Sequence, residues 1–196
     1  RQRQMCIRDR EGWEQFKNAK PNAAHLAIVE LEAAGKLQMV VTQNVDGLHR
    51  KAGTSPGKII ELHGTNAEIE CQTCGERSIP DPHFQYFQQH RKAPVCSSCG
   101  GYLKPATISF GQNLRPEDIA QATVAALKSN LVIALGSTLS VYPASGIPLI
   151  ATEKGIPYII INRGETDHDD LPEISLRLED DVTEIFPTAV KSAIRE

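Results

Sequence analysis

The chain has 196 residues, of which 40% are apolar and 23% are charged. This composition is close to the globular average, so it excludes disordered and fibrous classes. A formal net charge of -3 argues against a surface that as a whole attracts nucleic acid. The longest apolar runs, such as 131–135, are far shorter than the roughly 18–20 residues of a membrane span. We therefore expect one medium-sized domain, or one with a small insert, that binds neither nucleic acid nor a membrane.

Residues 1–10 carry four arginines without any hydrophobic periodicity. They fit either a basic arm that binds nucleic acid or a disordered or foreign extension. The second interpretation is favoured, because no aromatic residues interleave the arginines and the rest of the chain is acidic. We assign residues 1–12 to a leader outside the folded domain.

From Trp13 onward, helical and strand patterns alternate along the chain. The predicted helices are 21–35, 115–127, 144–154 (broken near its start by Pro148) and 182–194, and the predicted strands are 39–41, 58–62, 131–135, 158–161 and 176–178. Continuous apolar strands that alternate with helices are typical of a parallel sheet covered on both faces. In such sheets the ligand binds beyond the carboxyl ends of the strands.

Polar residues and glycines follow four of these strands, namely Gln43-Asn44, His63-Gly64, Gly136-Ser137 and Asn162. They suggest a nucleotide-sized ligand, although the chain has neither a G-x-G-x-x-G motif nor a P-loop. Asn44 and Asp46 before Gly47 also fit an ordinary turn, and a histidine at a strand end is commonly structural. Because an imidazole is the natural proton acceptor near neutral pH, the combination of His63 with Gln43 and Asn44 favours catalysis.

Four of the five cysteines form two C-x-x-C pairs with residues 75–95 between them. Each pair places two thiolates on one turn, so this spacing predicts a tetrahedral zinc site. A redox dithiol needs only one pair, and a secreted disulfide scaffold spreads its cysteines through a shorter chain. We predict one structural zinc ion, held within a small module at 68–104, and assign no role to Cys6. The predicted ligands are Cys71, Cys74, Cys96 and Cys99.

The motifs occur in the order Pro21-Asn22-x-x-His25, Thr42–His49, Glu61–Gly64, the two C-x-x-C pairs, Phe110-Gly111, Gly136–Leu139 with Val141 and Pro143, and Asn162. In this order they resemble the sirtuin family, from about Trp13 to the C-terminus. The resemblance implies a Rossmann-like, doubly wound parallel sheet, formed by 13–67 and 105–196, with the zinc module inserted. It also implies an NAD-dependent protein lysine deacylase of the transferase class, which acts on an acyl-lysine protein or peptide. A cytoplasmic location is the default expectation.

The resemblance implies a role for each matching residue. His63 matches the catalytic histidine, which takes protons from hydroxyls of the nicotinamide ribose while the acyl group, most simply acetyl, leaves the lysine. The products are free lysine, nicotinamide and O-acyl-ADP-ribose. The matching cofactor contacts are Gln43, Asn44, Val45, Asp46, Gly136, Ser137, Thr138, Asn162, Arg163, Gly164 and Val182. The substrate peptide is expected to add as a strand between the loops of Phe110-Gly111 and Val141.

Two features depart from the family pattern. Gln112 stands where an acid usually follows Phe-Gly, so the local peptide preference is expected to differ. The family's glycine-rich cofactor loop has no counterpart, so we expect a chain truncated at its start, with two strands of the sheet unpaired on their inner edges. The alternatives are an ADP-ribosyltransferase of the same family and a non-catalytic zinc-containing fragment that binds a partner.

Overall fold

The computed structural model of the chain describes residues 13–109 and 111–195, so the leader predicted at 1–12 and Phe110 lie outside the described residues. The chain divides into two compact units. Of the described residues, the cysteine unit contains 13–20, Asn44–Gly47 and His63–Asn113, and the parallel-sheet unit contains Pro21–Gln43, Leu48–Leu62 and 114–195. The cysteine unit is wider than the module predicted at 68–104, whose boundaries stay a prediction.

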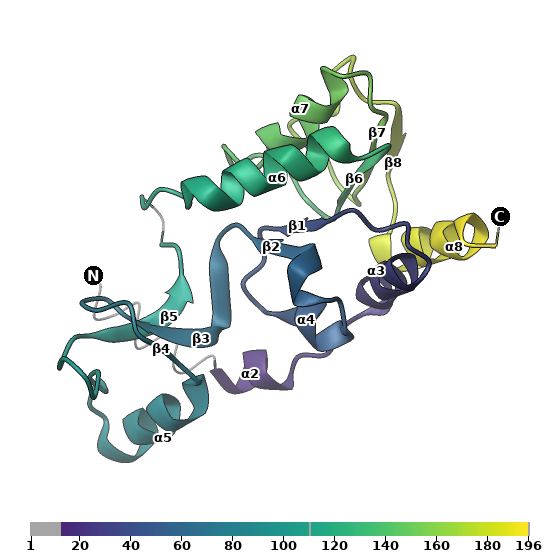
Figure 1. Cartoon of the computed structure of the whole chain (residues 1–196). Coiled ribbons are helices and arrows are strands. Elements are labelled where there is room, and N and C mark those ends of the chain that lie inside the picture. Colours follow the sequence, from purple (N-terminus) through teal and green to yellow (C-terminus); the bar gives the residue numbers. More distant parts are fainter. Residues whose placement is uncertain (1–12, 110, 196) are drawn as a thin grey trace. The chain divides into compact units, whose positions relative to one another are not determined.

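The strands of the parallel-sheet unit form two sheets (Figure 1). They are β1 (Val40–Thr42), β2 (Ile59–Glu61), β6 (Val132–Leu135), β7 (Tyr158–Ile161) and β8 (Leu176–Leu178). The sheet orders are β1-β2 and β6-β7-β8, and all neighbours run parallel. Within the described residues, β1 pairs only with β2 and β6 only with β7. The parallel strands and the interruption of the sheet agree with the prediction.

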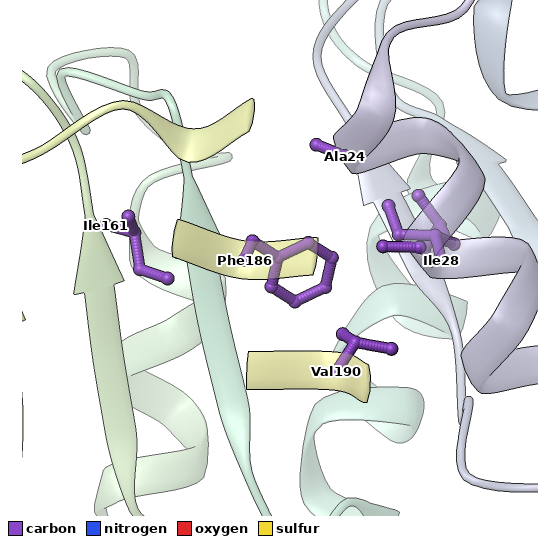
Figure 2. Packing of buried hydrophobic residues seen from close by; sticks show 7 residues of the cluster. Ala24, Ile28, Ile161, Phe186 and Val190 are labelled. Atoms are coloured by element: carbon purple, nitrogen blue, oxygen red, sulfur yellow. The ribbon is translucent and has the colours of Figure 1, made fainter. Parts of the chain in front are cut away.

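Helices cover both faces of these strands. They are α3 (Ala23–Ala33), α4 (Leu48–Ala52), α6 (Pro116–Lys128), α7 (Gly146–Thr152) and α8 (Val182–Ala193), with a short 3-10 helix at Pro56–Lys58. α3 and α8 pack together in one buried cluster, where Figure 2 shows Phe186 between Ile28 and Ile161. Val40 belongs to this cluster, whereas Val41 packs against the cluster of α6 and α7. Because successive strand residues point to opposite faces, this division confirms a doubly wound fold.

Local sequence signals explain where these helices begin. Asn22 caps α3, since its Oδ1 accepts a hydrogen bond from His25 N at 3.1 Å, and Pro116 occupies the first position of α6. The prediction that Pro148 breaks its helix was wrong, because Pro148 is the third residue of α7. A proline is tolerated in the first turn, where its missing N–H would have no partner within the helix. No helix of the described residues is long and apolar enough to cross a membrane.

The cysteine unit is built on an antiparallel sheet with the order β4-β3-β5 (Figure 1). Its elements are α2 (Trp13–Asn18), β3 (Gly64–Cys71), β4 (Arg77–Ser78), α5 (Pro80–His90) and β5 (Leu103–Thr107). A small core of Ile69, Phe84 and Leu103 packs with Cys71 and Cys96. The sequence analysis did not predict these strands or α5, because a core of this size leaves little hydrophobic periodicity in the sequence.

Gly64 begins β3 in a conformation that other residues rarely adopt. Its φ is +73°, and a Cβ built at this position would lie 2.1 Å from Ala106 O on the neighbouring strand β5. We expect Gly64→Ala to lower the free energy of unfolding by more than about 2 kcal/mol, since a left-handed conformation alone costs about 1–2 kcal/mol. Denaturant titration measures this loss.

Gly57→Ala is the matched control for this experiment. Gly57 has no positive φ, and its added Cβ would meet no atom within 4 Å. We expect its unfolding midpoint to stay close to that of the unmodified chain. Equal midpoints for both variants would contradict the expected clash at Gly64.

Candidate functional site

The four paired cysteines converge on one point of the cysteine unit. Their sulfur atoms all lie within 4.8 Å of one another. Cys71 Sγ lies 3.5 Å from Cys99 Sγ, and Cys74 Sγ lies 3.8 Å from Cys96 Sγ. A Zn–S bond of about 2.3 Å places the sulfurs of a tetrahedron about 3.8 Å apart. The four sulfurs therefore fit one tetrahedral zinc ion, which would have no open position for substrate or water.

The two C-x-x-C turns share one backbone geometry. Gly75 N donates to Cys71 O at 3.0 Å, and Gly100 N donates to Cys96 O at 2.9 Å. The turns also approach closely, because a Cβ built on Gly101 would lie 2.8 Å from Cys71 Sγ. Only a glycine fits there, and the sequence analysis did not identify Gly101 as part of the site.

The backbone also favours the thiolate form of Cys71. The N–H groups of Cys74 and Thr73 act on its sulfur and lower the pKa of Cys71 to about 6. Thr73 N lies 3.4 Å from Cys71 Sγ. Because zinc binds the deprotonated thiolate, these N–H groups favour metal binding through Cys71, whereas the pKa values of Cys74, Cys96 and Cys99 are raised.

The loop Asn44–Gly47 lies against the beginning of β3, within the unit that also contains His63. Asn66 N donates to Val45 O at 2.8 Å, which ties the loop to the residues that follow His63. The backbone of His63 is held as well, because its carbonyl accepts a hydrogen bond from Ile108 N at 2.8 Å. Two motifs that follow different strands of the sequence thus meet in one compact unit.

Other residues of the same sequence motifs lie in the parallel-sheet unit. Gln43 directly follows β1, and Thr42, the last residue of that strand, pairs in register with Glu61. The rings of His25 on α3 and His49 on α4 lie 4.7 Å apart between their centroids. Both histidines belong to the motifs that the resemblance uses, and here they join two helices. The sequence analysis assigned them no such structural role.

Predicted cofactor residues also gather at the carboxyl ends of β6 and β7. Gly136 N donates to Ile161 O at 2.9 Å, and Asn162 N donates to Leu178 O at 3.1 Å, so both residues continue the sheet by one step. A Cβ built on Gly136 would lie 3.6 Å from Val182 Cγ2. The first residue of α8 therefore lies beside the end of β6, where the resemblance leads us to expect a cofactor contact for both residues.

Arg163 is tied to the start of α8 through Asp181. Its guanidinium forms an ion pair with Asp181, whose other carboxylate oxygen caps the helix by accepting from Thr183 N at 2.7 Å. Hydrogen bonds from Thr183 hold the pKa of Asp181 below its usual range. The ion pair between Arg163 and the Asp181 carboxylate thus links the loop after β7 to the start of α8.

The loops after β6 and β7 are joined by a contact that the sequence analysis missed. Asp167 N donates to Thr138 O at 2.9 Å. Within the first loop, Leu139 N donates to Ser137 Oγ at 3.2 Å. The segment 166–169 therefore supports the loop that carries Gly136, Ser137 and Thr138, although its sequence matches no cofactor motif.

The residues predicted to contact the peptide lie in different units. Val141 is exposed in the parallel-sheet unit, and Gly111 lies in the cysteine unit, beside Phe110, which is outside the described residues. Gln112 closes the turn around Gly111, because its Oε1 accepts from Ser109 N at 2.8 Å and from Lys104 Nζ at 3.4 Å. A neutral amide thus takes the position where the family usually has an acid.

A buried polar pair joins Tyr158, the first residue of β7, to His168. The Tyr158 hydroxyl and His168 Nδ1 are 3.1 Å apart, and the two residues are 0% and 5% exposed. Burial lowers the pKa of His168, although the carboxylates of Asp167, Asp169 and Glu173 act in the opposite direction. A histidine with a lowered pKa binds fewer protons in the folded state than in the unfolded chain.

We therefore expect acid to destabilise the fold through His168. Its contribution is fully present above an unfolded pKa of about 6.5 and is lost as the pH falls toward the lower folded value. Thermal unfolding of the unmodified chain and of His168→Phe, compared between pH 7.5 and 5.5, measures the pH-dependent contribution of His168 to stability. The difference between their melting temperatures should change with pH, whereas His90→Phe, at an exposed position on α5, should run parallel to the unmodified chain. A pH-independent difference for His168→Phe would contradict the expectation.

Known proteins share this arrangement. Residues 3–143 match the Sir2 family. An NAD-dependent protein deacetylase of Rhodopseudomonas palustris is 38% identical over 162 residues, which cover 83% of this chain and 64% of that protein. An NAD-dependent protein deacetylase of Thermotoga maritima is 36% identical over 170 residues, which cover 87% of this chain and 68% of that protein.

Solved structures agree at the level of the fold. A structure of Sir2Tm bound to a propionylated peptide has a TM-score of 0.85 at 34% identity, covering 94% of this chain and 77% of that chain. A structure of Sir2 bound to an acetylated peptide has a TM-score of 0.85 at 33% identity, covering 94% and 76%.

A doubly wound parallel α/β fold together with four converging thiols that could hold one zinc ion defines a Rossmann-like class of protein. Within that class, the chain belongs to the Sir2 family, the sirtuins. It spans 64% of the length of its Rhodopseudomonas palustris relative. The recognition made from the motif order is therefore confirmed at the level of the family.

Proposed function

We propose that this protein is an NAD-dependent protein lysine deacylase that removes acetyl groups from lysine side chains. The observation that carries the proposal is the meeting of the Asn44–Gly47 loop with the strand that follows His63, through Asn66 N and Val45 O at 2.8 Å. It places amide, carboxylate and imidazole groups in one unit. The names of the relatives, NAD-dependent protein deacetylases, support the same activity.

In this proposal, each group of residues has a separate task. NAD, when bound, supplies the nicotinamide leaving group and the ADP-ribose that accepts the acyl group. His63 accepts a proton at a ring nitrogen from a ribose hydroxyl, which is a task for an imidazole near neutral pH. Gln43, Asn44 and Asp46 hold the nicotinamide side. Val45, between Asn44 and Asp46 in the same loop, is proposed as a further cofactor contact. The adenosine side is assigned to Gly136, Ser137, Thr138, Asn162, Arg163, Gly164 and Val182.

The donor chemistry of the β6 and β7 edge fits a dinucleotide. Gly136 and Gly164 are exposed and present no side chain that would block a ligand, and Asn162 and Thr138 offer amide and hydroxyl groups that can bind ribose hydroxyls. The zinc ion is proposed to be structural, because four thiolates fill its coordination sphere. It would hold the cysteine unit that contains His63.

The proposed substrate is an acyl-lysine protein or peptide that contacts Phe110, Gly111 and Val141. Structures of Sir2 with acetylated and propionylated peptides support this substrate class. A bovine relative named as a lipoamidase, 35% identical over 202 residues, indicates that acyl preference varies among the relatives of this chain. Acetyl is our proposal because most of the named relatives are deacetylases. A cytoplasmic location stays a prediction, which cell fractionation tests.

The test uses the zinc-loaded protein, an acetyl-lysine peptide and NAD labelled in its adenosine moiety. We expect nicotinamide release, free lysine and label in O-acetyl-ADP-ribose, all dependent on NAD. Label that stays on protein would instead support the ADP-ribosyltransferase alternative. Absence of both turnover and calorimetric NAD binding would overturn the proposal in favour of a non-catalytic zinc-containing partner-binding protein.

A further inference from the structure

Arg177, on β8, makes an unusually complete set of hydrogen bonds for a residue outside the predicted site. Its side chain is 20% exposed. Nη1 donates to Asn162 O at 2.9 Å and to Leu178 O at 2.6 Å, and Nη2 donates to Gly164 O at 2.5 Å. A planar guanidinium can serve several acceptors at once, which a lysine ammonium on a flexible stem does less well. The side chain of Arg177 thus holds the backbone of the loop after β7.

The side chain of Asn162 depends on the same carbonyl group. Asn162 Nδ2 donates to Gly164 O at 2.9 Å, so this oxygen accepts from both Asn162 and Arg177. Because only the nitrogen of an amide can donate to a carbonyl, the contact fixes which way the amide faces. Its oxygen, Oδ1, accepts no hydrogen bond from any residue that the structure describes. It remains available as an acceptor for a ligand.

Arg177 is itself anchored by Asp169. Arg177 Nε donates to Asp169 Oδ1 at 2.8 Å, and Thr166 donates to the same carboxylate through Oγ1 at 2.5 Å and through its backbone N at 3.0 Å. The hydrogen bond from Arg177, followed by that from Thr166, lowers the pKa of Asp169 to about 2. The carboxylate is therefore charged at any physiological pH. A partly buried, charge-assisted network of this kind holds its members in one geometry.

We propose that Arg177 is a positioning residue that turns the Asn162 amide so that Oδ1 accepts a hydrogen bond from a hydroxyl of the adenosine-side ribose. The inference rests on the proposed function, because it takes NAD as the ligand. Arg177 acts through Gly164 O and Asn162 and does not touch the ligand. Its loss should weaken binding of the adenosine part only as far as the loss of the Asn162 contact does.

The test is a double-mutant cycle on ADP-ribose binding, measured by calorimetry with the zinc-loaded protein. Asn162→Ala and Arg177→Met should each raise the dissociation constant about three- to tenfold, the effect of one net hydrogen bond. The double variant should bind no more weakly than Asn162→Ala alone, because both changes remove the same contact. Arg177→Lys, which keeps the charge, should fall between Arg177→Met and the unmodified chain. If Arg177→Met does not fold by circular dichroism, Asp169→Asn replaces it in the same cycle.

Arg77→Met is the matched control. Arg77 lies on β4, where it pairs with Glu68 and Glu70, so it is an arginine with two carboxylate partners in the other unit. Its loss should leave ADP-ribose binding unchanged. An additive double variant, or a dissociation constant that Arg177→Met leaves unchanged, would overturn the positioning role. If the unmodified chain does not bind ADP-ribose at all, the proposed function fails first and the inference fails with it.

Discussion

Replacing His63 with alanine is expected to reduce the rate of O-acetyl-ADP-ribose formation by about 10²–10⁴-fold, the usual contribution of a positioned general base. The substitution leaves the hydrogen bond between Ile108 N and the backbone carbonyl of residue 63 in place, so the strand should keep its path. The measurement is turnover of an acetyl-lysine peptide at saturating NAD, together with calorimetric binding of ADP-ribose. Turnover should collapse while ADP-ribose binding stays within a few-fold of the unmodified protein.

His90→Ala is the control for this experiment. His90 lies in the same unit, at the exposed end of α5, where its ring lies 4.5 Å from that of Tyr86. Its loss should leave turnover unchanged. If His63→Ala retains turnover close to that of His90→Ala, His63 is not the base, and the proposed chemistry has to be assigned to another group.

Removal of the zinc ion is expected to unfold the cysteine unit. The core of this unit is small, and two of its buried residues, Cys71 and Cys96, are themselves predicted ligands. Structural zinc contributes apparent binding free energies of about 10–16 kcal/mol in small domains, which exceeds the net stability of most of them. We expect one zinc ion per chain in elemental analysis. A strong chelator, or Cys71→Ser, should abolish the cooperative thermal transition of this unit.

The fifth cysteine offers a matched control. Cys6→Ser changes the same atom type at a position assigned no role, so the variant should retain one zinc ion and an unchanged melting temperature. Stoichiometric zinc and normal melting in Cys71→Ser would show that Cys71 is not a ligand. Cys74→Ser extends the comparison to an exposed member of the cluster. It should lose zinc in the same way, because a tetrahedral site needs all four thiolates.

The parallel-sheet unit was predictable because its signals are local. The apolar runs that form β6 and β7 match the predicted strands 131–135 and 158–161 to within one residue. Buried parallel strands carry such runs because both of their faces contact helices. The error at Pro148 came from treating a proline as a helix break without knowing where the helix begins. The helix begins at Gly146, so Pro148 lies in its first turn, where the missing N–H costs nothing.

The cysteine unit was less predictable because its sequence carries few local signals. Its zinc ligands were evident from spacing, but β3 carries few apolar residues and α5 has only two buried aromatic residues, Phe84 and Phe87. Its strands form through pairing across long stretches of sequence, as when Cys71 pairs in register with Leu103. Such pairings leave little local pattern in either strand.

The sequence by itself determined the family, the parallel α/β class and the spacing of the four thiolates, because motifs and apolar periodicity are properties of short segments. Only the tertiary structure showed which residues outside the motifs hold them in place. Arg177, Asp169 and Gly101 match no motif, and each matters through a contact that the motifs do not reveal. Hydrogen bonds to backbone carbonyls and the lack of room for a Cβ depend on the folded path of the chain. No pattern of residue types along the sequence can specify them.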